Sequence, residues 1–321
     1  MSINKPLVSI IIPCYNHEKF LDDCMWGLLH QTYDNMELLI CDDCSGDSSY
    51  DKICSYKKSL EEHFKRVVLK QNESNLGITK NLNQMLNEVH GEFVKIIASD
   101  DVLLPNAIEV YVDNALTNNG TCVLVSNGKK IKESSCAPEF EVLCDVYDAA
   151  PEFKRDNMIE HLMNSNPIFA PGVFMPYGIY EKCGFYDEQI AIEDLEYWMR
   201  IITGSSYEFR YIDESLVYYR LNENSISSHS VNGKLEKRRI MMHTSEMAIL
   251  EKYRDYIDKS KFAKTYLEKI IDEWVFANEN KLDNIKKLLK TEVHAKNIWN
   301  SLCMKEVFIY TFRFIKRYLG R

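Results

Sequence analysis

The sequence predicts an α/β fold in which a nucleotide-binding, mainly parallel sheet is flanked by helices and followed by a helical C-terminal region. Two observations carry this prediction. Short apolar runs alternate with amphipathic helical patterns through the first half of the 321-residue chain, as strand–helix–strand units do. Acidic and polar residues follow these runs, where the carboxyl ends of parallel strands share one rim and bind ligands.

The elements of the first half are predicted from their own patterns. Val8–Ile12 is a continuous apolar run, and His17–His30 has its apolar residues on one helical face. Pro105 precedes the helix over Ala107–Leu116, because proline fits the first helical turn. The remaining strands are expected at Glu37–Cys41, Val67–Lys70, Phe93–Ala98 and Cys122–Ser126, and the remaining helices from Asp47 or Ser48 through Ile53 and Leu60, and over Thr79–Val89.

The second half has weaker periodicity. Asn166-Pro167 and Ala170-Pro171-Gly172 disfavour helix and predict an extended or turning segment. From Lys234 onward the chain has few glycines and no proline, which predicts helices. The other expected elements are helices near Lys154–Asn164 and over Glu193–Thr203, and strands over Tyr207–Ile212 and Leu216–Tyr219.

Composition and charge exclude several classes of protein. The net charge of −9 argues against a general nucleic-acid binder, and no apolar run is long enough to span a bilayer. The first apolar run is too short for a signal peptide, so we expect a cytoplasmic protein whose ten cysteines are reduced. The segment Lys281–Arg321 carries a local charge of +7, which leaves −16 on the rest and suggests an anionic surface as its partner.

The clearest chemical feature is Asp100-Asp101, which ends an apolar run. Two adjacent carboxylates repel each other, so a cation or a sugar hydroxyl stabilises them, and hard oxygen ligands suit Mg²⁺ or Mn²⁺ with a diphosphate. A solvated helix cap is the alternative. Neither glycine-rich phosphate loop, G-x-G-x-x-G after the first strand or G-x-x-x-x-G-K-[ST], is found in the sequence.

The first 220 or so residues resemble a family 2 glycosyltransferase of the inverting GT-A type. The order and spacing of several segments together make this resemblance specific. The matching segments are VSIIIPCYNHEKFL, LLHQTYDNMELLICDDCS, NLGITKNLN, GEFVKIIASDD, CGFYDE and IEDLEYWMRI. The resemblance implies a GT-A domain over residues 1–230, with a nucleotide-sugar half at 1–127 and an acceptor half at 128–230, and a C-terminal helical region at 231–321.

The resemblance also implies roles for individual residues. Asp43 is expected to accept a hydrogen bond from the nucleotide base, Asp100 to lie nearest the ribose, and Asp101 to ligate the divalent metal. Asp194, in its pair with Glu193, is expected to be the catalytic base, although adjacent carboxylates at a helix start also fit helix capping. The remaining residues expected to line the nucleotide pocket are Pro13, Tyr15, Glu18, Lys80 and Asn81.

The expected activity is transfer of a sugar from a nucleoside diphosphate, with UDP favoured, to a hydroxyl of a surface polysaccharide or its lipid-linked precursor. Asn222 stands where many relatives carry a histidine, and His229 follows later. The alternatives are a sugar-nucleotide pyrophosphorylase and a non-catalytic scaffold. The basic tail Met304–Arg321 suits an anionic membrane surface or packing on the body or on another subunit, and the spread of its apolar positions favours packing.

Overall fold

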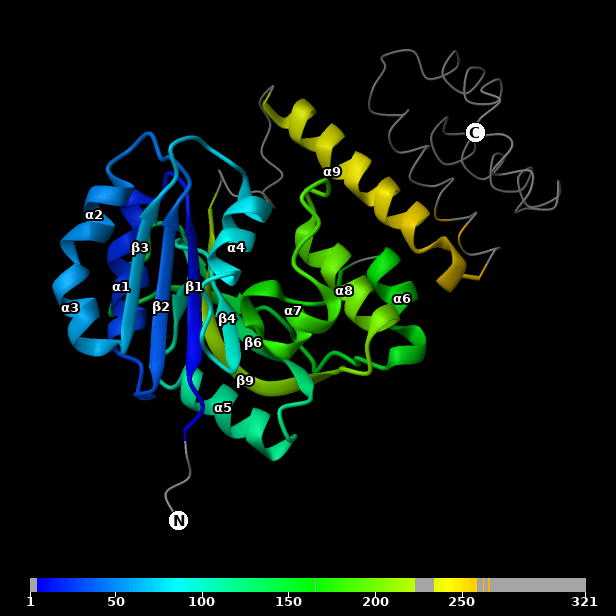
Figure 1. The fold of residues 1–321 in the computed structure, drawn as a ribbon, viewed down its shortest axis with the longest axis horizontal. Coiled ribbons are helices and arrows are strands. Elements are labelled where there is room, and N and C mark those ends of the chain that lie inside the picture. The colour runs from blue at the N-terminus through cyan, green and yellow to red at the C-terminus, as the bar shows by residue number, and fades with distance from the viewer. Residues whose placement is uncertain (1–4, 165, 223–233, 259–261, 263–264, 266–321) are drawn as a thin grey trace. The chain divides into compact units, whose positions relative to one another are not determined.

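The computed structural model describes residues 5–164, 166–222, 234–258, 262 and 265 (Figure 1). It divides the chain into two compact units, Met1–Val231 and Asn232–Arg321, which are considered separately. The strands are β1 Val8–Cys14, β2 Met36–Asp42, β3 Arg66–Gln71, β4 Phe93–Ile96, β5 Val102–Leu103, β6 Cys122–Lys132, β7 Val142–Asp145, β8 Val173–Pro176 and β9 Glu208–Leu221. The helices are α1 Leu21–Leu29, α2 Ser49–Ser55, α3 Lys57–His63, α4 Ile78–Leu86, α5 Ala107–Thr117, α6 Arg155–Asn164, α7 Gly178–Cys183, α8 Glu193–Gly204 and α9 Lys234–Lys252.

The first unit is built on one nine-stranded sheet, with the order β3-β2-β1-β4-β8-β6-β9-β5 and with β7 paired to β6. The strands β3, β2, β1 and β4 run parallel, and every residue of β1 and β2 is buried. Val8, Ile10 and Ile12 join the core that α1 covers, while α4 packs against β1 and β2. Cys14 and Asp42 are partners in register, so the loops after β1 and β2 leave the sheet side by side.

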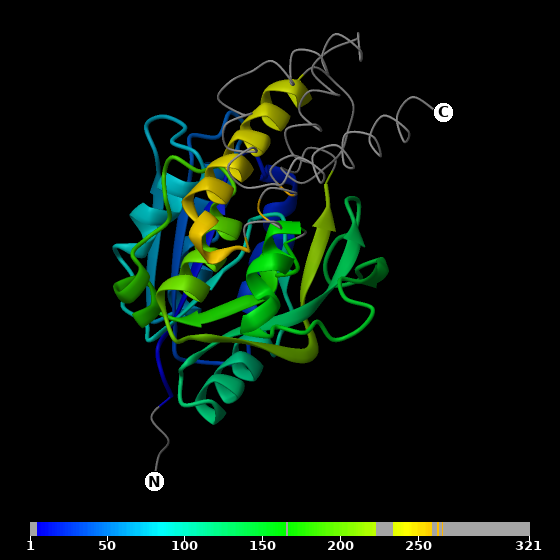
Figure 2. The ribbon, with the colours of Figure 1, turned by 90° about the vertical axis from the view of Figure 1, so that its right-hand side faces the viewer.

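The rest of the sheet is mixed. β8 pairs antiparallel with both β4 and β6, β6 runs parallel to β9, and β9 pairs antiparallel with β5. The two strands expected between residues 207 and 219 are one long strand, β9, which curves along its length (Figure 2). Register shifts around Asn127 in β6 accommodate the change of direction, so β6 and β9 stay paired where two separate strands were expected.

Other departures from the predicted elements are local. The helix expected through Ile53 and Leu60 is divided at Tyr56 into α2 and α3, because Tyr56 N–H bonds the carbonyl of Ile53 in a tight turn (3.1 Å). Ala170–Gly172 forms a short 3-10 helix, η2, in the segment predicted to turn. The strands β5, β7 and β8 and the helix α7 were not predicted, since each has six residues or fewer.

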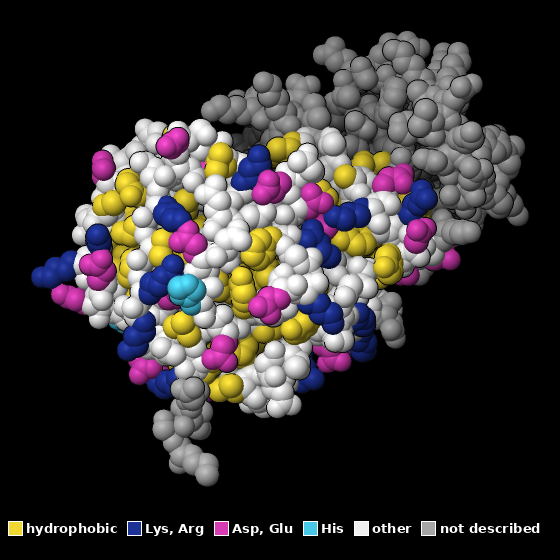
Figure 3. Space-filling view, viewed as in Figure 1, with side chains coloured by type: hydrophobic (Ala, Val, Ile, Leu, Met, Phe, Trp, Pro, Cys, Tyr) yellow, Lys and Arg dark blue, Asp and Glu magenta, His cyan; other side chains and the backbone are white. Residues whose placement is uncertain are grey.

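The described part of the second unit consists mainly of α9, followed by a 3-10 turn, η3, at Arg254–Tyr256. No described helix has the length and apolar character needed to cross a membrane. The tail Met304–Arg321 and His229 lie outside the described residues, so the predictions for them remain predictions. On the face drawn in Figure 3, basic and acidic side chains are interspersed over the described residues.

Candidate active site

The loop after β1 is fastened to the loop after β2. Asn16 has a φ of 55°, in the left-handed region that asparagine tolerates. Its N–H donates to Ser45 Oγ (2.8 Å), and its Oδ1 accepts the N–H of Gly46 (2.7 Å). Glu18 accepts a backbone N–H from the same loop (3.1 Å), so its carboxylate holds the two loops together. Tyr15 lies within this framework and is 48% exposed, which leaves its ring open to a ligand.

Asp43, predicted to face the nucleotide base, holds the loop that precedes α4. Its Oδ1 accepts Asn72 Nδ2–H (2.8 Å) and Leu76 N–H (2.9 Å), and its Oδ2 accepts Gly77 N–H (2.8 Å). Gly77 has a φ of 82°, which a glycine adopts without strain. A carboxylate offers about four acceptor positions, so these three bonds leave about one for a ligand.

The other residues predicted for the nucleotide pocket divide into buried and exposed ones. Asn81 is 1% exposed, and its Nδ2 donates to the carbonyl of Cys41 (3.0 Å), which ties α4 to β2. Pro13 is buried within β1. Lys80 is exposed on α4. Of these three side chains, that of Lys80 is exposed to solvent, whereas those of Asn81 and Pro13 are buried.

Asp100 and Asp101 follow β4, and the structure places them differently. Asp101 is 2% exposed and turned into the interior, where its Oδ1 accepts the N–H of Arg220 (2.9 Å). Asp100 faces the loop after β1, with its Oδ1 3.8 Å from His17 Nδ1. The same ring nitrogen lies 2.8 Å from Ser99 Oγ. The loop after β1 and the acid pair after β4 are thus brought together at one edge of the sheet.

Arg220, to which the sequence analysis assigned no role, organises this edge. Its guanidinium is buried (1% exposed) and donates from Nε to the carbonyl of Asp100 (3.0 Å) and from Nη2 to Asp23 Oδ2 (2.7 Å). Its Nη1 donates to three backbone carbonyls in the loop after β6 (2.6–3.3 Å). No local pattern marks this residue, because Asp23 lies 197 positions away in the sequence.

The acid pair after β4 fits a divalent ion that is bound together with a donor. Among the described residues, no group of three or more His, Cys, Asp or Glu side chains is arranged to hold a metal ion. Mg²⁺ in nucleotide sites, however, often uses one or two carboxylates plus substrate phosphates. Burial and the charge of Asp100 raise the pKa of Asp101 well above its usual range. Asp101 as the metal ligand therefore stays a prediction: its carboxylate accepts the N–H of Arg220, whereas Asp100 faces the loop after β1.

The second acid pair, Glu193-Asp194, opens α8, and both residues are half-buried. Asp194 Oδ2 accepts Asn166 Nδ2–H (2.9 Å), and its Oδ1 accepts the N–H of Leu195 (2.7 Å). A carboxylate at a helix N-terminus is favoured by the helix dipole. Asn166 was predicted only as part of a turn, yet its side chain orients Asp194.

The electrostatics of this pair differ from those of an ordinary helix cap. Burial and the charge of Asp194 raise the pKa of Glu193 to about 8, and burial raises the pKa of Asp194. No Lys or Arg among the described residues forms an ion pair with either carboxylate. Adjacent, half-buried carboxylates do not ionise together easily, so the pair holds a proton near neutral pH and keeps one carboxylate able to act as a base.

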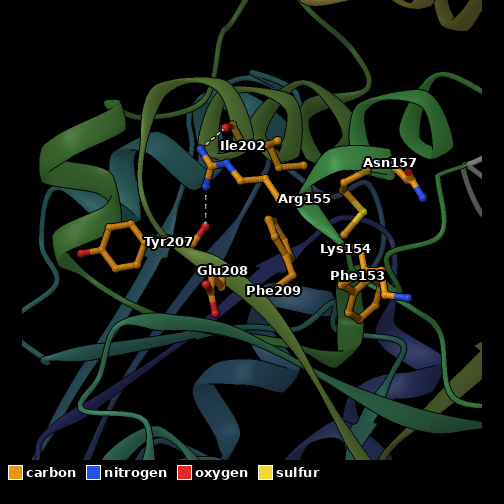
Figure 4. Close-up of a pocket in the computed structure, with 9 residues that line it drawn as sticks. Phe153, Lys154, Arg155, Asn157, Ile202, Tyr207, Glu208 and Phe209 are labelled. Atoms are coloured by element: carbon orange, nitrogen blue, oxygen red, sulfur yellow. Dashed lines mark hydrogen bonds between the residues drawn. The ribbon is translucent and has the colours of Figure 1, made fainter.

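The other end of α8 borders a cavity of about 450 Å³, lined by Phe153, Lys154, Arg155, Asn157, Met158, Ile202, Tyr207, Glu208 and Phe209 (Figure 4). The Arg155 guanidinium bonds the carbonyls of Ile202, Ser205 and Tyr207, so it caps the C-terminus of α8. Ile202, the residue of α8 that lines this cavity, lies about 13 Å along the helix from Glu193. The cavity is separate from the acid pair, and the bonds from Arg155 hold this end of α8.

Part of this chain matches a known protein family. Residues 9–138 match the model of "Glycosyl transferase family 2". The UDP-Glc:alpha-D-GlcNAc-diphosphoundecaprenol beta-1,3-glucosyltransferase WfgD of Escherichia coli is 36% identical over 113 residues, which cover 35% of this chain and 42% of that protein.

Two solved structures share the fold. Staphylococcus aureus TarS 1–349 in complex with UDP-GlcNAc has a TM-score of 0.60 and 19% identity, covering 92% of this chain and 79% of that chain. The mannosyltransferase PcManGT from Pyrobaculum calidifontis, in complex with GDP-Man and Mn²⁺, has a TM-score of 0.54 and 15% identity, covering 92% and 81%. Residues 9–138 therefore match the family that the sequence predicted, and the solved structures share the GT-A fold that was expected.

Proposed function

We propose that this chain transfers a sugar, with inversion, from a nucleoside diphosphate sugar to a hydroxyl of a glycan or lipid-linked acceptor. The observation that carries the proposal is the presence of two acid pairs in different environments. Asp100-Asp101 lies beside the loop after β1, as a donor site requires. Glu193-Asp194 opens α8 with raised pKa values, as a base for the acceptor requires.

In the proposed step, the acceptor oxygen attacks the anomeric carbon of the sugar while the bond from that carbon to the diphosphate oxygen breaks. The diphosphate leaves with the bonding electrons, and the acceptor proton passes to the carboxylate of Asp194. A single displacement from the face opposite the leaving group inverts the anomeric centre. Glu193 keeps its proton near neutral pH, which leaves the charge of the pair on Asp194.

The donor is held by the loops at the carboxyl ends of β1, β2 and β4. We assign Tyr15 and Lys80 to the border of the nucleotide pocket and the remaining acceptor position of Asp43 to the base. Mn²⁺ or Mg²⁺, bound with the donor, would stabilise the charge of the departing diphosphate. We assign the ion to Asp100, because Asp101 accepts the N–H of Arg220. The Mn²⁺ in the PcManGT complex supports the presence of a divalent ion.

A UDP-sugar is the donor that we propose, and a surface polysaccharide or its lipid-linked precursor is the proposed acceptor. The name of WfgD states a UDP-Glc donor and a diphosphoundecaprenol acceptor, and the TarS complex contains UDP-GlcNAc. These names support the class of substrate, since both proteins share this domain or its fold. A cytoplasmic location, and contact of the C-terminal region with a membrane surface or a second subunit, are further parts of this proposal.

The test is the release of nucleoside diphosphate from a panel of UDP-, GDP- and dTDP-sugars with Mn²⁺, with and without glycan acceptors. We expect release from a UDP-sugar that rises with acceptor and stops in excess chelator. Donor binding without release from any sugar nucleotide would indicate a non-catalytic scaffold. Formation of a sugar nucleotide and pyrophosphate from a nucleoside triphosphate and a sugar phosphate would indicate a pyrophosphorylase.

A further inference from the structure

Asn83 joins α4 to the loop that leads into the second acid pair. Its Nδ2 donates to the carbonyl of Tyr186 (3.0 Å), and its Oδ1 accepts the N–H of Tyr186 (3.0 Å), so the amide side chain pairs with the backbone as a neighbouring strand would. Nδ2 also donates to Glu188 Oε1 (3.2 Å). Asn83 is 9% exposed, and these bonds cross more than 100 positions of sequence.

Tyr186 lies in the loop that leads to the acid pair. Burial, together with nearby groups that include Glu193, raises the pKa of Tyr186 well above its usual range. The ring of Tyr186 packs on Tyr197 of α8, with centroids 4.6 Å apart. On the same helix, Arg200 Nη1 donates to the carbonyl of Phe185 (2.5 Å). The loop before Glu193 is therefore clamped between α8 on one side and Asn83 on the other.

The helix that carries Asn83 belongs to the donor side of the molecule. Its N-cap is Gly77, whose N–H is held by Asp43, and Asn81 bonds the carbonyl of Cys41 in β2. From Gly77 to Asn83 the helix rises by about 9 Å. One rigid helix thus carries the nucleotide loop at its start and the Tyr186 contact near its end.

We propose that Asn83 is a positioning residue for transfer, which sets the Glu193–Asp194 pair relative to the donor-binding loops through Tyr186. This inference rests on the proposed function, because positioning matters only if the pair supplies the base. Asn83 acts through the loop and contacts neither substrate. A displacement of about 1 Å between reacting groups can cost roughly 10²-fold in rate, so one lost bridge is sufficient to matter.

The test compares Asn83→Ala with Asn87→Ala, a control on the same helix whose Nδ2 bonds only the carbonyl of Asn83 within the described contacts. We expect Asn83→Ala to keep its UDP affinity in calorimetry within about twofold while transfer falls roughly 10²-fold. We also expect the pH profile of transfer to move to lower pH, because a looser loop hydrates Glu193. Asn87→Ala should behave as wild type in each measurement.

Amide hydrogen exchange over residues 184–194 provides a readout that does not depend on activity. Faster exchange in Asn83→Ala, and unchanged exchange in Asn87→Ala, supports the bridge. Unchanged exchange, or wild-type transfer in Asn83→Ala, overturns the inference. Equal losses of UDP affinity and transfer would also overturn it, since they indicate a general structural role. Wild-type protein that transfers no sugar from any donor contradicts the proposed function itself, a result that is distinguished from these by the wild-type assay.

Discussion

The chain contains two pairs of consecutive acidic residues, Asp100-Asp101 and Glu193-Asp194. The pairs are alike in sequence, but the groups that surround them differ. Asp100-Asp101 lies at a sheet edge where a buried guanidinium, that of Arg220, bonds the backbone of one member, and a backbone N–H bonds the carboxylate of the other. Glu193-Asp194 opens a helix, has no ion pair among the described residues and is oriented by the amide of Asn166. Burial raises the pKa of a carboxyl group in both pairs, but only the first pair is bonded to a buried guanidinium among the described residues.

This difference shows how neighbouring carboxylates acquire separate tasks. A fixed pair with one member facing a ligand loop suits a static role, such as holding an ion with a diphosphate. A half-buried pair without a cation has raised pKa values and suits proton transfer. The proposed division into donor and acceptor functions rests on these surroundings, because both pairs have almost the same side-chain chemistry.

The largest expected effect is the loss of stability when Arg220, which is bonded to the first pair, is replaced. Arg220→Met should lower the free energy of unfolding by about 3–5 kcal/mol, because it leaves the buried Asp23 carboxylate without its partner. Urea denaturation measures this change. Arg210→Met, on the same strand but exposed, is the control and should change stability by less than about 1 kcal/mol. Similar losses of stability in the two variants would show that Arg220 does not organise this edge of the sheet.

The next prediction separates the members of the first pair. Asp100→Asn should weaken Mn²⁺-dependent binding of UDP by about 1.5–3 kcal/mol, the usual worth of a contact with a charged group. Asp101→Asn should leave that binding nearly unchanged, since an amide oxygen can still accept the N–H of Arg220. Titration calorimetry with and without Mn²⁺ measures both. A larger loss of UDP affinity in Asp101→Asn than in Asp100→Asn would identify Asp101 as the metal ligand.

A third prediction concerns the second pair and pH. The folded-state pKa of Glu193 is raised to about 8 from an ordinary 4.5, so the stability it contributes is complete below pH 4.5 and is lost as the pH rises through 8. Glu193→Gln should abolish that part of the decline, which is at most about 1.4 kcal/mol per unit of pKa difference. Thermal unfolding between pH 5 and 9 compares the two. If stability depends on pH in the same way in wild type and in Glu193→Gln, the pKa of Glu193 is not raised in the folded protein.

Much of the donor side could be predicted from sequence, because its signals are local. The apolar runs of β1 and β2, and the acidic residues after them, place the candidate site at one rim. The contacts that organise the rim could not be predicted. Arg220 meets Asp23, and Asn83 meets Tyr186, across long stretches of chain, and nothing near either residue in the sequence marks the pairing.

The same distinction between local signals and long-range contacts applies to the predicted site residues. Asp43 and Asn81 were assigned to the nucleotide from the family resemblance, whereas their hydrogen bonds to neighbouring backbone became visible only in the folded chain. The short strands β5, β7 and β8 were missed because segments of two to four residues have no detectable period. They form through pairing with longer strands.

The most direct test of the central claim, that the two pairs divide donor binding and proton removal, measures UDP affinity and sugar transfer together in Asp194→Asn. The variant should bind UDP with Mn²⁺ as tightly as wild type, while transfer falls by roughly 10²–10⁴-fold, the usual worth of a general base. Glu193→Gln should reduce transfer less, because Glu193 in the wild type is already protonated near neutral pH. Wild-type transfer by Asp194→Asn, or a loss of UDP binding equal to the loss of transfer, would contradict the account.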